Sequence, residues 1–359
     1  MVGFCLAAGA GSRLHPLTRV LPKPLLAPAG RPLVDLAVEA LLAAGAARVV
    51  VNAHHGAGRL AAHLADRPGV RLVREPVPLG TGGGLANAAR LGLLGDGDDP
   101  VLVTCADHVV DPADLAALAA FLQHTGVPMA AGLVPSAEPT FGLRLDGSPP
   151  PGARQGPSDA ARPAGGHTAP IGRPAAGLPD GGRVVRDPLG PWDSAGAYAL
   201  RAGALDGLRP VPSTLDAALL GPLLERGALA GLPFRGPVAD AGTLHRLLLA
   251  SAGLLAGCWP YDLPAGALLT PTGRGHLGGP VLVADGASHH PAATIAGPVV
   301  LDGGSRVAAG AVVTRAILGP GAVVGAGARV VGSVLGPGAS LAPGAVAVAA
   351  LLPGPPVLG

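Results

Sequence analysis

The chain has 359 residues, enough for two domains, with 49% hydrophobic residues, 13% charged residues and a formal net charge of +2. Aromatic residues make up only 2% and no long basic stripe is present, which excludes nucleic acid as an expected partner. No apolar run reaches the roughly 18 residues of a spanning helix, and no basic segment precedes the apolar start, so we expect a cytoplasmic protein without a membrane partner.

Apolar strand-like runs alternate with helical segments through the first part of the chain. The pattern predicts strands over residues 2–7, 48–52, 70–74 and 101–105, and helices over residues 33–44, 58–65, 84–91 and 112–122. Gly45 follows the first helix as a stop signal, and Asp111 precedes the last as an N-cap. This alternation predicts an α/β fold with a Rossmann-like, mostly parallel sheet.

A different composition marks the middle of the chain. Residues 148–179 are dense in Pro, Gly, Ala and Arg without an apolar period, which predicts a low-complexity insertion. Strand-like sequence resumes at residues 183–186 and 195–200, and helices are expected over 214–226 and 244–255. We therefore expect one domain over residues 1–256 that contains the insertion, followed by a linker over 257–280.

The last part of the chain has a six-residue period. Apolar residues recur at Ile295, Leu301, Val307 and Val313, and the same step returns further on with Gly and other small residues in between. Such a hexapeptide repeat is similar to that of a left-handed parallel β-helix, in which the apolar residue of each unit points inward. We expect a short β-helix over residues 281–346 with a tail over 347–359, and a homo-oligomer formed through this region.

A glycine loop follows the first predicted strand and has the chemistry of a phosphate site. Gly9 and Gly11 let an anion approach the backbone N–H groups, Arg13 offers a fork of donors, and Lys23 adds a point charge. The spacing fits neither a P-loop nor the dinucleotide fingerprint, because Leu14 stands where the third glycine of that fingerprint belongs.

Residues 6–25 resemble a known family signature. They match L-A-x-G-x-G-[ST]-R-L-x-P-L-T-x-x-x-P-K-P-L, the pattern of sugar-1-phosphate nucleotidyltransferases, also called nucleotide-sugar pyrophosphorylases. Further segments resemble the same family: residues 30–33, 75–76, 79–85, 105–107, 141–142, 194–198 and 240–243. Together with the hexapeptide tail, they make the mannose-1-phosphate guanylyltransferase-like branch the most similar one, although residues 81–85 are also similar to the N-acetylmuramate-1-phosphate uridylyltransferase type.

The resemblance implies a reaction and a set of site residues. The reaction is NTP plus sugar 1-phosphate giving NDP-sugar and pyrophosphate, with Arg13 and Lys23 as the catalytic cations. Asp107 and Asp240 would hold Mg²⁺, which prefers carboxylate oxygens and phosphates. The implied nucleotide-binding residues are Ala7, Ala8, Gly9, Gly11, Ser12, Glu75, Gly80, Thr81, Gly82 and Gly83, and the implied sugar-binding residues are Gly142 and Ser194. The three glycines of residues 80–83 would allow close approach of the ligand.

The sugar side departs from the family pattern. Asp187 stands where the family has a Lys that meets the sugar phosphate, with Arg186 beside it, and Ser194 replaces the family Asn. Three alternatives therefore stay open: a uridylyl- or thymidylyltransferase for an N-acetylmuramate- or glucose-type sugar 1-phosphate, a non-catalytic homologue that senses nucleotide sugars, and a second, acyltransferase activity in the tail.

Cysteine and histidine spacing predicts no separate metal site. Cys5, Cys105 and Cys258 are isolated, so we expect small buried residues in a reducing compartment. The histidine pairs at residues 54–55 and 289–290 lack partners at metal-ligand spacing and are expected in surface loops.

Overall fold

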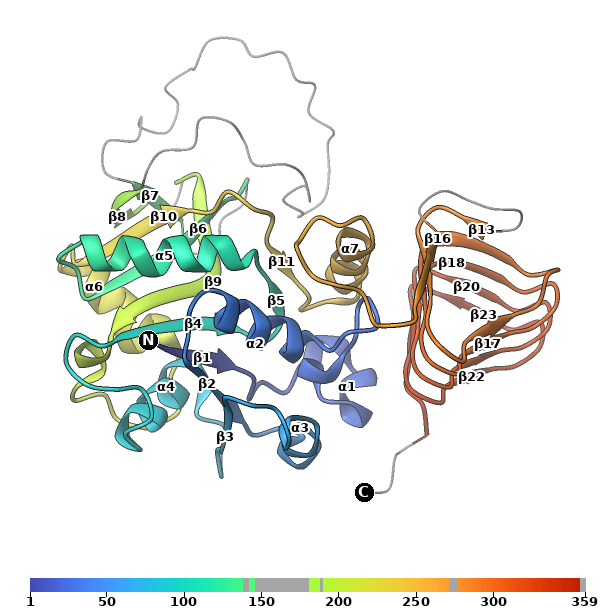
Figure 1. Cartoon of the computed structure of the whole chain (residues 1–359), viewed down its shortest axis with the longest axis horizontal. Coiled ribbons are helices and arrows are strands. Elements are labelled where there is room, and N and C mark those ends of the chain that lie inside the picture. The colour runs from blue at the N-terminus through green and yellow to red at the C-terminus, as the bar shows by residue number, and fades with distance from the viewer. Residues whose placement is uncertain (138–141, 146–180, 188–189, 271–276, 356–359) are drawn as a thin grey trace, which may run out of the picture.

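The computed structural model describes residues 1–137, 142–145, 181–187, 190–270 and 277–355, so the expected insertion at 148–179 lies outside it. Two parts lie side by side: an α/β part, and a stack of short strands formed by the C-terminal residues (Figure 1). Among the described residues, no helix has the length and apolar character needed to cross a membrane.

A nine-stranded sheet forms the centre of the α/β part, in the order β3-β2-β1-β4-β9-β6-β10-β8-β7. Its strands are β1 (Val2–Leu6), β2 (Arg48–Ala53), β3 (Val70–Arg74), β4 (Pro100–Cys105), β6 (Met129–Pro135), β7 (Leu143–Leu145), β8 (Gly182–Arg186), β9 (Trp192–Arg201) and β10 (Leu229–Pro233). The four strands β1 to β4 are parallel, as expected, whereas β9 runs antiparallel between β4 and β6. The α/β class is thus confirmed, and the sheet is mixed because the later strands return in both directions.

Helices cover both faces of this sheet. The α-helices are α1 (Leu17–Val20), α2 (Leu33–Ala43), α3 (Ala57–Leu64), α4 (Gly80–Arg90), α5 (Pro112–His124), α6 (Gly221–Glu225) and α7 (Leu244–Leu255). Short turns of other helix types are η1 (Ser12–Leu14), η2 (Lys23–Leu25), η3 (Ala202–Leu205) and η4 (Asp216–Leu220). Helices α2 and α5 share one hydrophobic cluster with Cys5, while α4, η4 and α6 share the opposite cluster with Phe4. Neighbouring residues of β1 thus face opposite cores, which explains the continuous apolar run of this strand.

One local detail confirms the predicted N-cap, and a second places the predicted metal ligands. The side chain of Asp111 accepts a hydrogen bond from the N–H of Ala113 at 2.8 Å and so caps α5. A two-stranded antiparallel ribbon joins β5 (His108–Val109) to β11 (Ala239–Asp240), at the edge of the sheet where β4 ends. This ribbon brings the two predicted metal ligands to one place.

The C-terminal strands stack on one another in register. They are β12 (Leu268–Thr270), β13 (Leu277–Gly278), β14 (Val281–Val283), β15 (Ser288–His289), β16 (Thr294–Leu301), β17 (Arg306–Val307), β18 (Val312–Leu318), β19 (Val323–Val324), β20 (Arg329–Val331), β21 (Val334–Leu335), β22 (Ser340–Leu341), β23 (Val346–Val348) and β24 (Leu351–Leu352). Their pairings are parallel except between β12 and β14. Ile295, Leu301, Val307 and Val313 are all buried, as the six-residue period predicts. The arrangement is compatible with a β-helix, and its strand pairing extends on both sides of residues 281–346.

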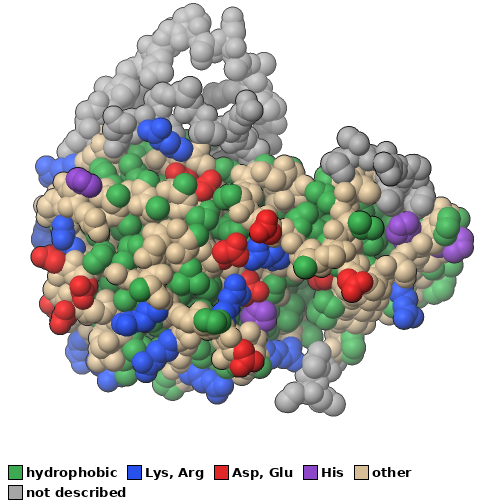
Figure 2. Space-filling model, in the orientation of Figure 1, with side chains coloured by type: hydrophobic (Ala, Val, Ile, Leu, Met, Phe, Trp, Pro, Cys, Tyr) green, Lys and Arg blue, Asp and Glu red, His purple; other side chains and the backbone are tan. Residues whose placement is uncertain are grey.

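The strand stack packs on the α/β part through an apolar contact. Val300 and Ile317 belong to the same hydrophobic cluster as Leu17 of α1 and Trp259. The contact with α1 is close, because a Cβ added to Gly336 would lie 2.7 Å from the Cδ1 atom of Leu17. On the face drawn in Figure 2, acidic and basic side chains are interspersed over the α/β part, while the described part of the stack carries few charged groups.

Candidate active site

The glycine loop begins where β1 ends and is held by two hydrogen bonds to side chains. The N–H of Ala7 donates to Oδ1 of Asn52 at 2.7 Å, and the hydroxyl of Thr18 donates to the carbonyl of Gly11 at 2.9 Å. Gly11 has φ of 64°, and an added Cβ would lie 3.0 Å from the Cβ of Lys23. A side chain at Gly11 would therefore strain the backbone and push against Lys23, so the loop needs glycine there.

The other side of the loop is open. A Cβ added to Gly9 would meet nothing within 4 Å, and Gly9 and Ser12 are both exposed. Within the described residues, the N–H groups of Gly9, Ala10 and Gly11 meet no backbone acceptor. The loop thus presents free donors to solvent, next to the half-buried Ala8, as a phosphate group requires.

The backbone segments that carry the two predicted metal ligands lie side by side. Asp240 of β11 is paired with His108 of β5, and the N–H of Ala241 donates to the carbonyl of Asp107 at 2.8 Å. These segments are far apart in the chain, and the ribbon between them brings the two aspartates to the edge of the sheet where β1 also ends.

Cations surround this pair of carboxylates. The ammonium group of Lys23, which is 8% exposed, pairs with Oδ2 of Asp107, and Arg246 pairs with Oδ2 of Asp240. The guanidinium of Arg13 lies over Gly242, since an added Cβ there would be 2.6 Å from Nη2 of Arg13 and 2.7 Å from Oδ1 of Asp240. Both predicted cations therefore lie next to the two predicted metal ligands.

Burial and charge act in opposite directions at Asp107. Burial alone would raise the pKa of Asp107, but the hydrogen bonds and charges of His108 and Lys23 outweigh it and hold this pKa well below its usual value. Burial would likewise lower the pKa of His108, but the hydrogen bond and charge of Asp107, together with Cys105, raise it well above its usual value. Asp107 is thus an anion held between two cationic partners.

The donor set fits a hard divalent cation. Oδ1 of Asp240 is buried and has no hydrogen-bond partner among the described residues, although a carboxylate oxygen in such a place requires one. A second carboxylate, that of Asp107, comes from the backbone segment paired with that of Asp240. Oxygen ligands of this kind suit Mg²⁺ together with phosphate oxygens and water.

The carboxylate of Glu75 is held by groups of the protein. Glu75 is 4% exposed; its Oε1 accepts from Asn52 at 2.6 Å, and its Oε2 accepts from the N–H of Leu79 at 3.2 Å. Because Asn52 in turn holds Ala7, the carboxylate of Glu75 connects the glycine loop to the start of α4. Glu75 thus positions Asn52 and Leu79 within the protein, and its role in nucleotide binding stays a prediction.

The glycines at residues 80–83 lie against a neighbouring stretch of backbone, and their contact with a ligand stays a prediction. Cβ atoms added to Gly80, Gly82 and Gly83 would lie 2.5, 2.5 and 2.1 Å from backbone oxygens of residues 213, 214 and 211. The N–H of Gly82 donates to the carbonyl of Ser213 at 3.0 Å, and the hydroxyl of Thr81 accepts from the N–H of Leu215 at 2.7 Å. The glycines thus let α4 pack directly on the backbone of residues 211–215, and a ligand is not needed to explain them.

This close packing predicts a loss of stability for Gly83→Ala. The added methyl group overlaps the carbonyl oxygen of Val211, and we expect the free energy of unfolding to fall by about 1–3 kcal/mol. Gly58→Ala is the matched control: Gly58 also lies in a helix, but its added Cβ would meet nothing, so this change should raise stability by up to about 1 kcal/mol. Urea denaturation of both variants checks the difference, and equal midpoints would contradict the packing argument.

On the predicted sugar side, the polar groups bind one another. Gly142 is buried and its carbonyl accepts from the N–H of Asp187 at 2.8 Å. The hydroxyl of Ser194 donates to the Oη of Tyr198 at 2.8 Å and accepts from the N–H of Gly196 at 3.1 Å. Ser194 and Tyr198 border a hollow that is otherwise lined mainly by apolar side chains: Ala131, Leu143, Leu220, Leu224 and Leu229, with Asp216 at its edge.

Arg186 and Asp187 stand where the family has its sugar-phosphate lysine, and neither offers an unpaired positive charge. Asp187 pairs with Nε of Arg144 at 3.1 Å, and Arg186 pairs with Oδ1 of Asp216 at 3.3 Å. The structure therefore brings the triphosphate-side residues together, whereas the sugar-phosphate contact has no cation in the expected position.

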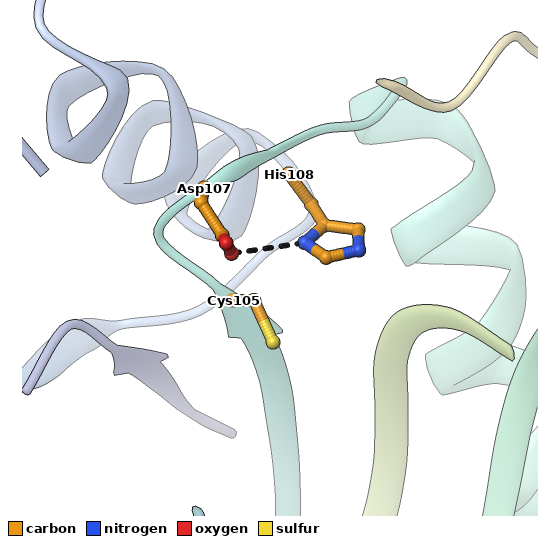
Figure 3. A group of neighbouring side chains, drawn as sticks. All are labelled: Cys105, Asp107 and His108. Atoms are coloured by element: carbon orange, nitrogen blue, oxygen red, sulfur yellow. Dashed lines mark hydrogen bonds and ion pairs between the residues drawn. The ribbon is translucent and has the colours of Figure 1, made fainter. Parts of the chain in front are cut away.

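Four residues of this region were missed in the sequence. Asn52 and Arg246 hold the loop and Asp240, and Cys105 and His108 flank Asp107 (Figure 3). The sequence signal that could have identified Asn52 is a polar Asn at the end of the apolar run at residues 48–52. In the structure this side chain is 2% exposed. Residues 54–55 lie in a loop after β2, as expected, but both are half-buried and bond backbone carbonyls, His54 that of Glu75 at 2.9 Å.

Comparisons with known proteins agree on the class of the α/β part. Residues 2–143 match the family model described as "Nucleotidyl transferase". The chain is 40% identical over 115 residues to the N-acetylmuramate alpha-1-phosphate uridylyltransferase of Caulobacter vibrioides, covering 30% of this chain and 46% of that protein. It is 36% identical over 148 residues to the mannose-1-phosphate guanylyltransferase of Mycobacterium tuberculosis, covering 37% and 40%. The matched segment thus spans less than half the length of each of these relatives.

Solved structures support the same fold. A putative glucose-1-phosphate thymidylyltransferase from Bacillus anthracis superposes with a TM-score of 0.52 at 18% identity, covering 70% of this chain and 94% of that one. A UDP-glucose pyrophosphorylase has a TM-score of 0.52 at 17% identity, covering 71% and 98%. At these identities the likeness shows the fold alone.

Proposed function

We propose that this chain, which carries a nucleotidyl transferase domain of the sugar-1-phosphate nucleotidyltransferase family, transfers a nucleotidyl group from an NTP to a sugar 1-phosphate, giving an NDP-sugar and pyrophosphate. The observation that carries the proposal is the meeting of Arg13, Lys23, Asp107 and Asp240 beside an open glycine loop. Such a cluster suits a polyphosphate with its metal.

The chain contributes binding and charge neutralisation in this mechanism. The free N–H groups of residues 9–11 hold the triphosphate, and Arg13 and Lys23 neutralise the charge that develops on it. An oxygen of the sugar phosphate attacks the α-phosphorus in line; that P–O bond forms as the bond to the β-phosphate breaks, and pyrophosphate leaves with the electron pair. No protein nucleophile is needed because the attacking group is already an anion, so catalysis is positioning plus charge neutralisation.

We propose that Asp107 and Asp240 hold Mg²⁺ when the nucleotide binds. The cation supplies charge neutralisation for the phosphate oxygens. The buried, unpartnered Oδ1 of Asp240 supports this assignment, and the ion pairs with Lys23 and Arg246 balance the two carboxylates when no metal is bound.

For the substrate, we propose guanine as the base and mannose as the sugar. The support is the combination of the glycine loop with a C-terminal strand stack, together with the similarity to a mannose-1-phosphate guanylyltransferase. The alternative is uridylyl or thymidylyl transfer to an N-acetylmuramate- or glucose-type sugar 1-phosphate, supported by the similarity to an N-acetylmuramate alpha-1-phosphate uridylyltransferase. Assays with each pair of substrates distinguish them.

A second candidate function follows from the sugar side. Asp187 and Ser194 are held by protein partners, which favours a non-catalytic homologue that binds a nucleotide sugar and regulates an active enzyme. NDP-sugar binding measured by calorimetry, without turnover of any substrate pair, would support the sensor and contradict the enzyme.

We further propose that the C-terminal strands form a short left-handed β-helix, that the chain forms a homo-oligomer through it, and that the protein is cytoplasmic. Val346 and Val348 are each 61% exposed on β23, the last strand in the order of its sheet, and exposed apolar side chains on an edge strand favour association. Sedimentation of the full chain tests the oligomer; a mass equal to the monomer's 34.8 kDa at micromolar concentration would exclude it.

A further inference from the structure

Three side chains of different chemistry meet at the end of β4. Cys105 is the last residue of β4, Asp107 lies in the following turn, and His108 begins β5. One ligand atom from each lies within 4.8 Å of the other two. Figure 3 shows the carboxylate of Asp107 facing the His108 ring, with the Cys105 side chain nearby. None of the roles proposed above uses the thiol or the imidazole.

This donor set suits a different kind of metal from the one expected between the aspartates. Zinc-class ions take thiolate, imidazole and carboxylate ligands at about 2.0–2.3 Å in a tetrahedron, and three protein ligands with one open position are a common arrangement. Mg²⁺ prefers oxygen ligands alone, while a thiolate and an imidazole select zinc and related transition metals. The chemistry of Cys105 and His108 therefore points away from Mg²⁺.

The three ligands are held in place by the surrounding backbone. Cys105 pairs with Leu6 of β1, and His108 pairs with Asp240 of β11, so both ligands lie on strands with fixed register. The His108 ring lies over Gly196, where an added Cβ would be 2.7 Å from both Cδ2 and Nε2 of the ring. Gly196 also has φ of 69°, so a side chain there would be strained and would displace the imidazole.

The Lys23 pair uses one carboxylate oxygen of Asp107, so the other oxygen can serve as a metal ligand. Oδ2 of Asp107 pairs with Lys23, whereas Oδ1 lies 3.0 Å from Nδ1 of His108. An ion between Oδ1, Nδ1 and the Cys105 sulfur would replace that hydrogen bond and leave the Lys23 pair intact. A second partner that orients a ligating carboxylate in this way is typical of metal sites.

We propose that Cys105, Asp107 and His108 bind a zinc-class divalent ion, and that this ion competes with Mg²⁺ because both sites use the carboxylate of Asp107. Binding releases the thiol proton of Cys105 and the proton shared by His108 and Asp107. The inference rests on the geometry of these three residues and holds whether or not the chain is catalytic.

Cobalt titration of the full-length protein without added Mg²⁺ tests the site, because a thiolate bound to Co²⁺ gives a charge-transfer absorption that an oxygen-only site cannot give; rising Mg²⁺ should then weaken Co²⁺ binding. We expect one Co²⁺ per chain, this absorption, and its loss when Zn²⁺ is added. Cys105→Ser should abolish the absorption, and His108→Gln should weaken binding at least about 10-fold, since loss of even an indirect partner costs roughly 10–100-fold.

Cys258→Ser is the matched control, because Cys258 is half-buried and belongs to no metal-ligand group found among the described residues. It should bind Co²⁺ as the unchanged protein does. The proposal is overturned if the unchanged protein gives no thiolate absorption with Co²⁺, if Cys105→Ser retains that absorption, or if Cys258→Ser loses it. Thermal melts of the variants without metal show whether each is folded, and His108→Gln provides a second test if Cys105→Ser is not.

Discussion

Replacing Lys23 by alanine is expected to lower kcat/KM by about 10²–10³-fold, the usual cost of removing one preorganised group that stabilises developing charge. Lys23 is 8% exposed, is paired with Asp107 and lies against Gly11 of the glycine loop. Its charge is thus held in a largely desolvated place beside the free N–H groups that would take the triphosphate. Steady-state kinetics with the preferred substrate pair measures the loss.

Lys23 is also the only lysine in the 359-residue sequence, although arginine occurs throughout. Arginine occupies all the remaining Lys/Arg positions of this chain, so we expect the site at Lys23 to require a compact ammonium instead of a planar fork. We therefore expect Lys23→Arg to lose at least about 10-fold in kcat/KM despite keeping the charge.

Chemical modification can test the role of Lys23, because the sequence contains no other lysine. An amine-directed reagent has one lysine to modify, and a saturating NTP should protect it, as peptide mass spectrometry would show. Full activity of Lys23→Arg, or modification of Lys23 that NTP does not slow, would contradict the role given to this residue.

Asp240→Asn is expected to lower kcat by about 10²–10³-fold and to raise the Mg²⁺ concentration needed for half-maximal activity. The substitution keeps the shape of the side chain but replaces an anionic oxygen by an amide group, at the position of the buried, unpartnered Oδ1. It also leaves Arg246 without its carboxylate partner. Kinetics at a series of Mg²⁺ concentrations separates the loss of metal affinity from the loss of turnover.

Asp98→Asn is the matched control for this change. The Asp98 side chain is 89% exposed and pairs with Arg201 at 3.3 Å, so the same loss of one negative charge far from the loop should leave kcat and the Mg²⁺ dependence unchanged. A wild-type Mg²⁺ dependence in Asp240→Asn would remove Asp240 from the metal site.

The sequence allowed prediction of the class of fold and the residues on the phosphate side. Strong apolar runs located β1, β2 and β4 within one or two residues, because buried strands leave little freedom in composition. Asp107 and Arg13 could be expected to converge because both follow the carboxyl ends of neighbouring parallel strands, β4 and β1. Asp240 comes from a later segment, and only its pairing with β5 explains its position.

Contacts between distant segments explain why the start of α4 and the surroundings of Glu75 differ from those expected from the sequence. The glycines of residues 79–85 read as a ligand loop, but residues 211–215 pack against them, so α4 begins at Gly80 rather than at the expected residue 84. The carboxylate of Glu75 is similarly occupied by Asn52. A single sequence does not reveal which backbone will fill the space beside a glycine or which side chain will meet a buried carboxylate.

The proposed metal-binding group of Cys105, Asp107 and His108 was missed for a related reason. Cys105 and His108 are close in sequence to Asp107, but three ligands within four residues match none of the spacings common to zinc sites. The sharp turn after β4, followed by the first residue of β5, brings the three side chains together. Local spacing is informative only when the backbone between the ligands is known.

Pyrophosphate release by the full-length protein in Mg²⁺, measured across a matrix of NTPs and sugar 1-phosphates, tests the central claim most directly. The account predicts stoichiometric pyrophosphate and NDP-sugar with one preferred pair, GTP with mannose 1-phosphate, and no release when either substrate is omitted. Absence of release from every pair, by protein that is folded and binds an NDP-sugar, would contradict it.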